Sequence, residues 1–161
     1  MAVRLPERSL EVSHPPDWEP TRVEPPSSAM TGLRLATSAH TSTDPSFYMY
    51  VWFDHEAREA SKVESALRAD LLKGEKEGWR WNELRPTTIG GKPAAVFEQD
   101  MTANPPPRYK GADTCDCIRR WYIAQWQDSH VLQIEFHALA PAAYHSYLPI
   151  AERIVGTVRS V

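Results

Sequence analysis

The sequence predicts an α+β fold in which an antiparallel β-sheet is flanked by helices. Three observations lead to this fold class. Several short segments alternate apolar and polar residues, which is typical of β-strands with one buried face. Two other segments carry apolar residues at helical spacing. The order of these segments lacks the regular alternation of strand and helix that a parallel sheet requires.

Three strands are predicted in the first third of the chain. Residues 9–13 and 33–37 alternate apolar and polar side chains. Residues 47–53 are apolar or aromatic at every position, which is typical of a strand covered on both faces. Paired prolines at 15–16 and 25–26 mark the loops that separate these strands.

The clearest helix is predicted to start at Asp54 and to end near Gly74. Asp54 is a suitable N-cap, because its carboxylate can accept hydrogen bonds from the free N–H groups of a first turn. Spacings of three, four and four residues then form one buried stripe. That stripe consists of Ala60, Val63, Leu67 and Leu71.

The second half of the chain predicts four more strands and a final helix. The strands are residues 79–84, 94–99, 118–126 and 131–138, with a tight turn at Gly90 and Gly91 before the second of them. Residues 102–117 form a long irregular loop. We place the final helix at residues 149–158, because proline suits the first turn of a helix and not its interior.

Length and composition favour one domain over residues 1–161. A chain of 161 residues lies within the range of about 100–200 residues for one domain. The net charge of −3 is not that of a nucleic-acid-binding protein. No apolar run approaches the roughly 20 residues that cross a bilayer, and the first residues lack the apolar stretch of an export signal. We therefore expect a cytoplasmic protein that binds neither nucleic acid nor membrane, with a trimmed form of an exported domain as the alternative.

Several of these segments together match a known family. They are the Pro-Pro-Asp-Trp after the first strand, Glu77-Gly78-Trp79 at the end of the helix, residues 89–94, the strands at 118–126 and 131–138, and residues 151–159. In these features the chain resembles the Mog1/PsbP-like superfamily, particularly small bacterial proteins of the DUF1795 type. The resemblance spans nearly the whole chain and implies an α/β/α sandwich. Its lipoprotein members carry an export signal that is absent here, and residues 102–117 have no counterpart.

The same resemblance implies a function without catalysis. Members of the superfamily act as assembly factors, as a GTPase-binding protein and as secretion adaptors that shield hydrophobic segments. The family has no catalytic residues to carry over to this chain. Fold alone does not fix function.

Motifs of common enzyme sites are incomplete. His55-Glu56 begins like the HExxH zinc-protease motif, but the fifth position is Glu59. The Gly-Gly-Lys at 90–92 lacks phosphate-loop spacing, and no G-x-S-x-G elbow occurs. A metal pair of His55 with Glu59 and an acid–base pair of Glu135 with His137 stay open beside their interpretation as solvated polar residues. We expect no catalytic residue and no cofactor.

Cys115 and Cys117 are the two cysteines of the chain. In a strand these positions lie roughly 6.5–7 Å apart, near the limit for a disulfide. We interpret them as reduced thiols. Two local ligands fall short of the four that structural zinc needs, although His130 or His137 could complete a site.

Aromatic residues are the more informative excess, with six Trp and six Tyr. Tyr48, Tyr50 and Trp52 share one strand face, which is either core or a partly uncovered groove. Trp and Tyr suit contacts, because each combines a large apolar area with a polar tip. We expect these three residues to bind a partner, with Trp121 or Trp126 adjoining. The loop side chains Arg108, Tyr109 and Lys110 would form a mobile lip.

Two main hypotheses for function follow. In the first, the protein is a non-enzymatic adaptor or chaperone-like module that holds a hydrophobic segment of a protein partner on its sheet face. In the second, it binds a small molecule or a metal, as an enzyme or a carrier. That site would lie between the sheet and residues 102–117, with Cys115, Cys117 and His137 as its polar groups. A third hypothesis is a homodimer through the same strand face, so monomer and homodimer both stay open.

The first hypothesis predicts the outcome of replacing one aromatic residue. Trp52→Ala should weaken partner binding and leave the thermal midpoint nearly unchanged. A large loss of stability would instead place Trp52 in the core. Capture of the tagged protein from its native cells, together with thermal unfolding, measures both effects.

Overall fold

Ten strands and two helices make up the described part of this computed structural model, which is residues 1–5, 10–23, 30–37, 47–54, 59–105, 118–127, 130–139 and 141–161. The strands are β1 (Ala2–Leu5), β2 (Leu10–Ser13), β3 (Trp18–Val23), β4 (Met30–Thr37), β5 (Phe47–Asp54), β6 (Arg80–Ile89), β7 (Lys92–Asp100), β8 (Ile118–Gln127), β9 (His130–Ala138) and β10 (Arg159–Ser160). The helices are α1 (Ala60–Glu75) and α2 (Pro141–Thr157).

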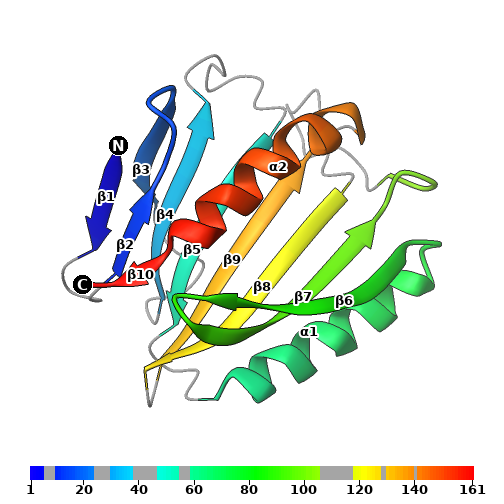
Figure 1. The fold of residues 1–161 in the computed structure, drawn as a ribbon. Helices are drawn as coiled ribbons and strands as arrows, with labels where there is room; N and C mark the ends of the chain where they lie inside the picture. Colours follow the sequence, from blue (N-terminus) through cyan, green and yellow to red (C-terminus); the bar gives the residue numbers. More distant parts are fainter. Residues whose placement is uncertain are drawn as a thin grey trace.

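The strands form one large and one small sheet. The large sheet has seven strands in the order β3-β4-β5-β9-β8-β7-β6, and every neighbouring pair is antiparallel. The small sheet has the order β1-β2-β10. Helices α1 and α2 lie on opposite faces of the large sheet (Figure 1). The predicted α+β fold class with an antiparallel sheet between helices is therefore confirmed.

The main core lies on the face of the large sheet that carries α2. Strand residues of alternate positions, such as Phe47 in β5 and Phe136 in β9, belong there to one buried cluster with Ile154 of α2. Leu10 and Val12 of the small sheet join the same core. Helix α2 and the small sheet together therefore cover this face.

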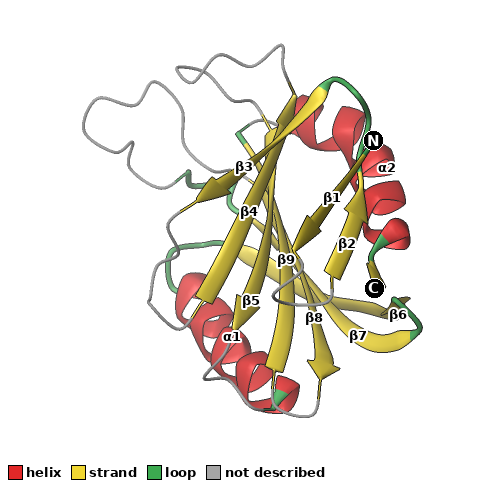
Figure 2. Cartoon of the chain, turned by 90° about the vertical axis from the view of Figure 1, so that its left-hand side faces the viewer, coloured by secondary structure: helices red, strands yellow, loops and turns green. Residues whose placement is uncertain are grey.

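The opposite face is covered by a helix over part of its width only (Figure 2). Helix α1 contacts β6, β8 and β9, and its Leu71 packs in a smaller cluster with Phe97 and Trp121. Strands β3, β4 and β5 have no helix over this face within the described residues. The expectation that residues 47–53 are covered on both faces is therefore only half right, because Tyr48 and Tyr50 stay partly exposed.

The predicted starts of both helices are wrong. Asp54 is the last residue of β5, and α1 begins at Ala60 after Glu59, whose extended backbone makes it the N-cap residue. His55 lies outside the described residues. Helix α2 begins at Pro141 and contains Pro149 in its interior. Pro149 and the residue four positions earlier, His145, are both exposed, so the carbonyl that loses its helical donor can bind water.

Neither of the two described helices is long and apolar enough to span a membrane.

The tight turn before β7 is confirmed, since Gly90 and Gly91 have φ angles of 57° and 78°. Positive φ favours glycine because glycine has no Cβ to clash with the backbone.

The small sheet is held together by one buried carboxylate. Glu11 of β2 lies opposite Arg4 of β1 and Arg159 of β10. The Arg4 Nε donates to Glu11 Oε2 at 2.5 Å and the Arg159 Nε to Oε1 at 2.8 Å. Hydrogen bonds from Arg4 and Arg159 lower the pKa of Glu11 below 4.5, against the opposing effect of burial. The ionised form of Glu11 is therefore favoured by folding.

Stability should consequently fall when Glu11 is protonated. A carboxyl group whose pKa is lower in the folded state stabilises the fold above its unfolded-state pKa, and this contribution is lost as the pH drops through the folded-state value. We expect the thermal midpoint of the wild type to fall more than that of Glu11→Gln between about pH 5 and pH 3. Circular dichroism at each pH measures this, and equal falls in the two proteins would contradict it.

Candidate functional site

Three aromatic side chains form an ordered row on the face that carries α1. We call Tyr48, Tyr50 and Trp52 of β5 the aromatic row. Tyr50 stacks on Trp52 with a centroid distance of 5.1 Å and an interplanar angle of 14°. Tyr48 stacks on His137 of β9 at 5.0 Å and 20°. The row is therefore held in place by ring contacts within the sheet face itself.

Trp52 is the most deeply buried residue of this row. It is only 8% exposed, and it lies opposite Gly32 of β4. A Cβ at Gly32 would overlap the six-membered ring of Trp52, so this position needs glycine for space. Trp52 is largely buried, so Trp52→Ala is expected to lower the thermal midpoint, and a contact of Trp52 with a partner stays a prediction. Tyr48 and Tyr50 are half-buried.

A charged group lies beside the row. His137 Nε2 is 2.9 Å from Glu135 Oε2, and Arg119 Nη2 is 3.7 Å from the same oxygen. Burial raises the pKa of Glu135, but the His137 hydrogen bond, the charges of His137 and Arg119 and a hydrogen bond from Trp52 together lower it. Glu135 is thus a fixed negative charge. The pairing of His137 with Glu135 is real, but both side chains are largely buried and not solvated.

A hollow of about 410 Å³ lies between α1 and the sheet, next to this group. We call it the α1 hollow. Arg119 lies over its Trp121 wall, with the guanidinium carbon 4.9 Å from the ring centroid. Apolar residues of α1 face polar residues of β7, β8 and β9 across it. The lining consists of Val63, Ala66, Leu67, Asp70, Leu71, Trp79, Gln99, Arg119, Trp121, Gln133 and Glu135.

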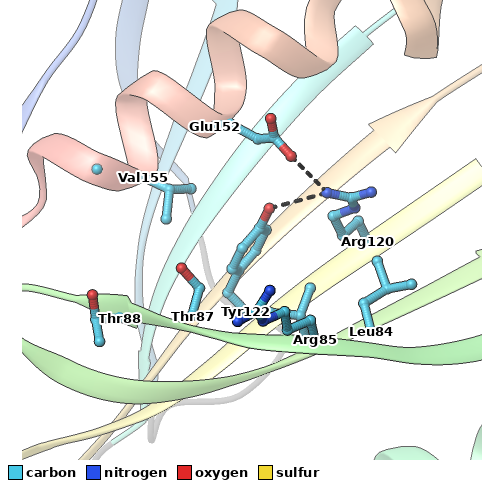
Figure 3. A pocket seen from close by; sticks show the side chains of 10 residues that line it. Leu84, Arg85, Thr87, Thr88, Arg120, Tyr122, Glu152 and Val155 are labelled. Carbon is cyan, nitrogen blue, oxygen red and sulfur yellow. Dashed lines mark hydrogen bonds and ion pairs between the residues drawn. The ribbon is translucent and has the colours of Figure 1, made fainter.

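A second hollow of about 280 Å³ lies on the other face, between α2 and strands β6 to β8. Figure 3 shows its Arg120 reaching both Glu152 of α2 and the hydroxyl of Tyr122, at 2.9 and 3.3 Å. The same guanidinium donates two hydrogen bonds to Glu98. Burial opposes the charge of Arg120, but these partners outweigh it and raise its pKa. Arg120 and its three partners thus satisfy one another and tie α2 to the sheet.

The remaining predicted site residues are separated by the fold. Trp121 lies on the face of the aromatic row but is buried beneath α1. Trp126 does not adjoin the row, because its side chain is 1% exposed in the core on the opposite face. The loop residues Arg108, Tyr109 and Lys110 lie outside the described residues, as do Cys115 and Cys117. Within the described ranges, no three potential metal ligands gather at one point.

Sequence reasoning missed the polar residues of the α1 hollow. Gln99 and Arg119 are direct partners in the register of β7 and β8 and face α1 together. The alternation of β7 and β8 assigns each of them to a face. Alternation does not say which helix covers which face. The position of Gln99 and Arg119 side by side beneath α1 could therefore not be predicted from residue spacing.

Comparison with known proteins gives the fold. No protein-family model matches the chain, and no curated protein matches it. The solution structure of cyanobacterial PsbP (CyanoP) from Synechocystis sp. PCC 6803 is similar, with a TM-score of 0.60 at 7% sequence identity. The similarity covers 100% of this chain and 92% of that chain. The fold is PsbP-like. The narrower likeness to Mog1 and to DUF1795 proteins stays a prediction.

The packing of Trp52 on Gly32 predicts a non-additive pair of substitutions. Gly32→Ala should destabilise the protein by about 1–3 kcal/mol through overpacking. Trp52→Ala should cost about 3–5 kcal/mol. The double variant should cost less than the sum, because removing the ring removes the overlap.

Urea unfolding of the three variants measures these free energies. Gly156→Ala is the matched control, since a Cβ there meets no atom within 4 Å and the residue lies in α2. This control should leave stability unchanged or raise it slightly. Strictly additive costs at positions 32 and 52 would show that the two residues are not in contact.

Proposed function

We propose that the protein is a non-enzymatic interaction module that holds a hydrophobic segment of a protein partner against the aromatic row. One observation carries this proposal. The row lies on the part of the α1 face that no described helix covers, and Tyr48 and Tyr50 keep part of their surface exposed. Such a surface combines apolar ring faces with hydroxyl tips, which is favourable for contact with a partner.

The fixed geometry of the row supports this role. Tyr48 and Tyr50 meet edge to face with a centroid distance of 5.3 Å, in addition to their stacks on His137 and Trp52. Rings that are already ordered lose little conformational freedom when a partner binds. In this proposal Tyr48 and Tyr50 contact the partner, and Trp52 supports them from below.

In this proposal the protein is an adaptor or chaperone-like module that acts in the cytoplasm. The resemblance to the Mog1/PsbP-like superfamily implies binding roles such as assembly and secretion, and it carries no catalytic residues. The Glu135–His137 pair does not favour catalysis, because Glu135 is engaged by three neighbours and His137 is 5% exposed. The loop side chains Arg108, Tyr109 and Lys110 would complete the site as its lip.

Replacement of the two exposed rings tests this function. We expect Tyr48→Ala/Tyr50→Ala to lose a protein that the tagged wild type captures from its native cells, because contact residues of this kind dominate interface energies. Tyr48→Phe/Tyr50→Phe is the matched control and should keep the partner, since it retains the rings. Mass spectrometry identifies the captured protein.

Two further results decide between occupants of the row. Retention of the partner by the alanine variant would refute the aromatic row as the contact surface. Light scattering of the purified protein at two concentrations shows whether a second copy of the chain occupies the row. A dimer that dissociates in the alanine variant would replace the adaptor by the homodimer.

A further inference from the structure

Two polar groups in the α1 hollow lack partners. Gln99 is 5% exposed, and its side chain forms no hydrogen bond with any residue that the structure describes. Its amide nitrogen lies against Gly74, near the end of α1. The Nε of Arg119 is buried and has no hydrogen-bond partner either. Buried polar groups in folded proteins are almost always paired, so the unpaired Arg119 Nε, next to a buried amide without a described hydrogen bond, is a position where a ligand can complete the hydrogen bonding.

The hollow offers free donors, since the Arg119 Nε is unpartnered and the Gln99 amide carries N–H groups beside its oxygen. Glu135 is already hydrogen-bonded to His137 and Trp52, and the nearest Arg119 nitrogen is 3.7 Å away, beyond hydrogen-bond distance. Asp70 at the rim is exposed and lies 3.5 Å from Lys73. The Arg119 Nε and the Gln99 amide, which belong to register partners on β8 and β7, keep unused hydrogen-bonding capacity. A guanidinium matches a carboxylate in both charge and geometry.

Much of the remaining lining is apolar, beside the polar side chains of Asp70, Gln133 and Glu135. Val63, Leu67 and Leu71 line it from α1, and the rings of Trp79 and Trp121 close it from the other side. Its volume of about 410 Å³ lies within the range of about 300–1,000 Å³ found for small-molecule sites. The body of a fitting ligand is therefore apolar, and its polar group is at one end.

We propose that the α1 hollow binds a monocarboxylic acid with an apolar body, its carboxylate held by Arg119 and Gln99 and its body packed between α1 and Trp121. This site is separate from the aromatic row and does not depend on the function proposed for it. The carboxylate belongs either to a free aliphatic acid or to the C-terminal residue of an apolar peptide. Both sources present the same chemistry to the hollow.

Isothermal titration calorimetry with sodium octanoate tests the chemistry. We expect saturable binding at one site per chain. 1-Octanol and octylamine have the same chain length, and each should bind at least about tenfold more weakly, because neither offers a carboxylate to the guanidinium. The proposal is overturned if 1-octanol binds as tightly as octanoate. It is also overturned if neither octanoate nor the free-acid peptide described below binds.

Substitutions locate the site and separate binding from folding. Gln99→Leu should weaken octanoate binding at least about fivefold and keep or raise the thermal midpoint, because it replaces an unpaired buried amide by an apolar side chain. A lower midpoint with unchanged binding would show that Gln99 is structural and overturn the proposal. Arg119→Met should abolish octanoate binding. Arg68→Met is the matched control, since Arg68 lies on α1 outside the hollow and pairs with Glu83.

A peptide pair distinguishes the two sources of the carboxylate. Acetyl-Gly-Gly-Leu is titrated as the free acid and as the C-terminal amide. Tighter binding of the free-acid peptide than of octanoate identifies a peptide C-terminus as the preferred source, and the reverse order identifies a free acid. Equal binding of the acid and amide peptides would show that no carboxylate is recognised.

Discussion

The width of the large sheet is the constraint on which the rest of the structure depends. Seven strands at a spacing of about 4.8 Å make a sheet roughly 29 Å wide, whereas a helix with its side chains is about 10 Å across. No single helix can cover such a face. On one face, α2 is joined by the small sheet, whose Leu10 and Val12 extend the core. On the other face the described residues provide α1 alone, so the sheet covers itself there with stacked rings.

This difference between the faces explains the character of the two hollows. Beside α2, the guanidinium of Arg120 is surrounded by Glu98, Glu152 and Tyr122, and each group has its partner within the chain. Beneath α1, the Nε of Arg119 has no hydrogen-bond partner and its guanidinium is ion-paired to Glu135 only at 3.7 Å, and Gln99 is buried without a hydrogen bond to a described residue. A group of the first kind fastens a helix to a sheet. A group of the second kind has unmet hydrogen-bonding capacity, which is the property that distinguishes a binding site from a structural contact.

The sequence predicted those parts of the fold that depend on local pattern. Alternation located β2, β4 and the four strands from β6 to β9, because one buried face leaves a period of two in the residues, and a continuous apolar run located β5. It could not locate β1 or β10, which are short and exist through pairing with β2. It also passed over β3, where Pro20 is tolerated because β3 pairs only with β4 in the described sheet. For the site, parity placed Tyr48, Tyr50 and Trp52 on one face, but the burial of Trp52 depends on Gly32 of another strand. A contact between residues of two different strands cannot be predicted from the spacing of apolar residues within one strand.

The ion-paired small sheet has a mechanical consequence. Strands β1 and β10 both run antiparallel to β2, so they run parallel to each other. Residue 1 lies at the Ser13 end of β2 and residue 161 at the Leu10 end, as Figure 1 shows. A force that pulls these two residues apart acts along the strands and loads all their hydrogen bonds at once, together with both arginine pairs of Glu11. The chain resists such a load by shear, which is a stronger arrangement than bonds that open one after another.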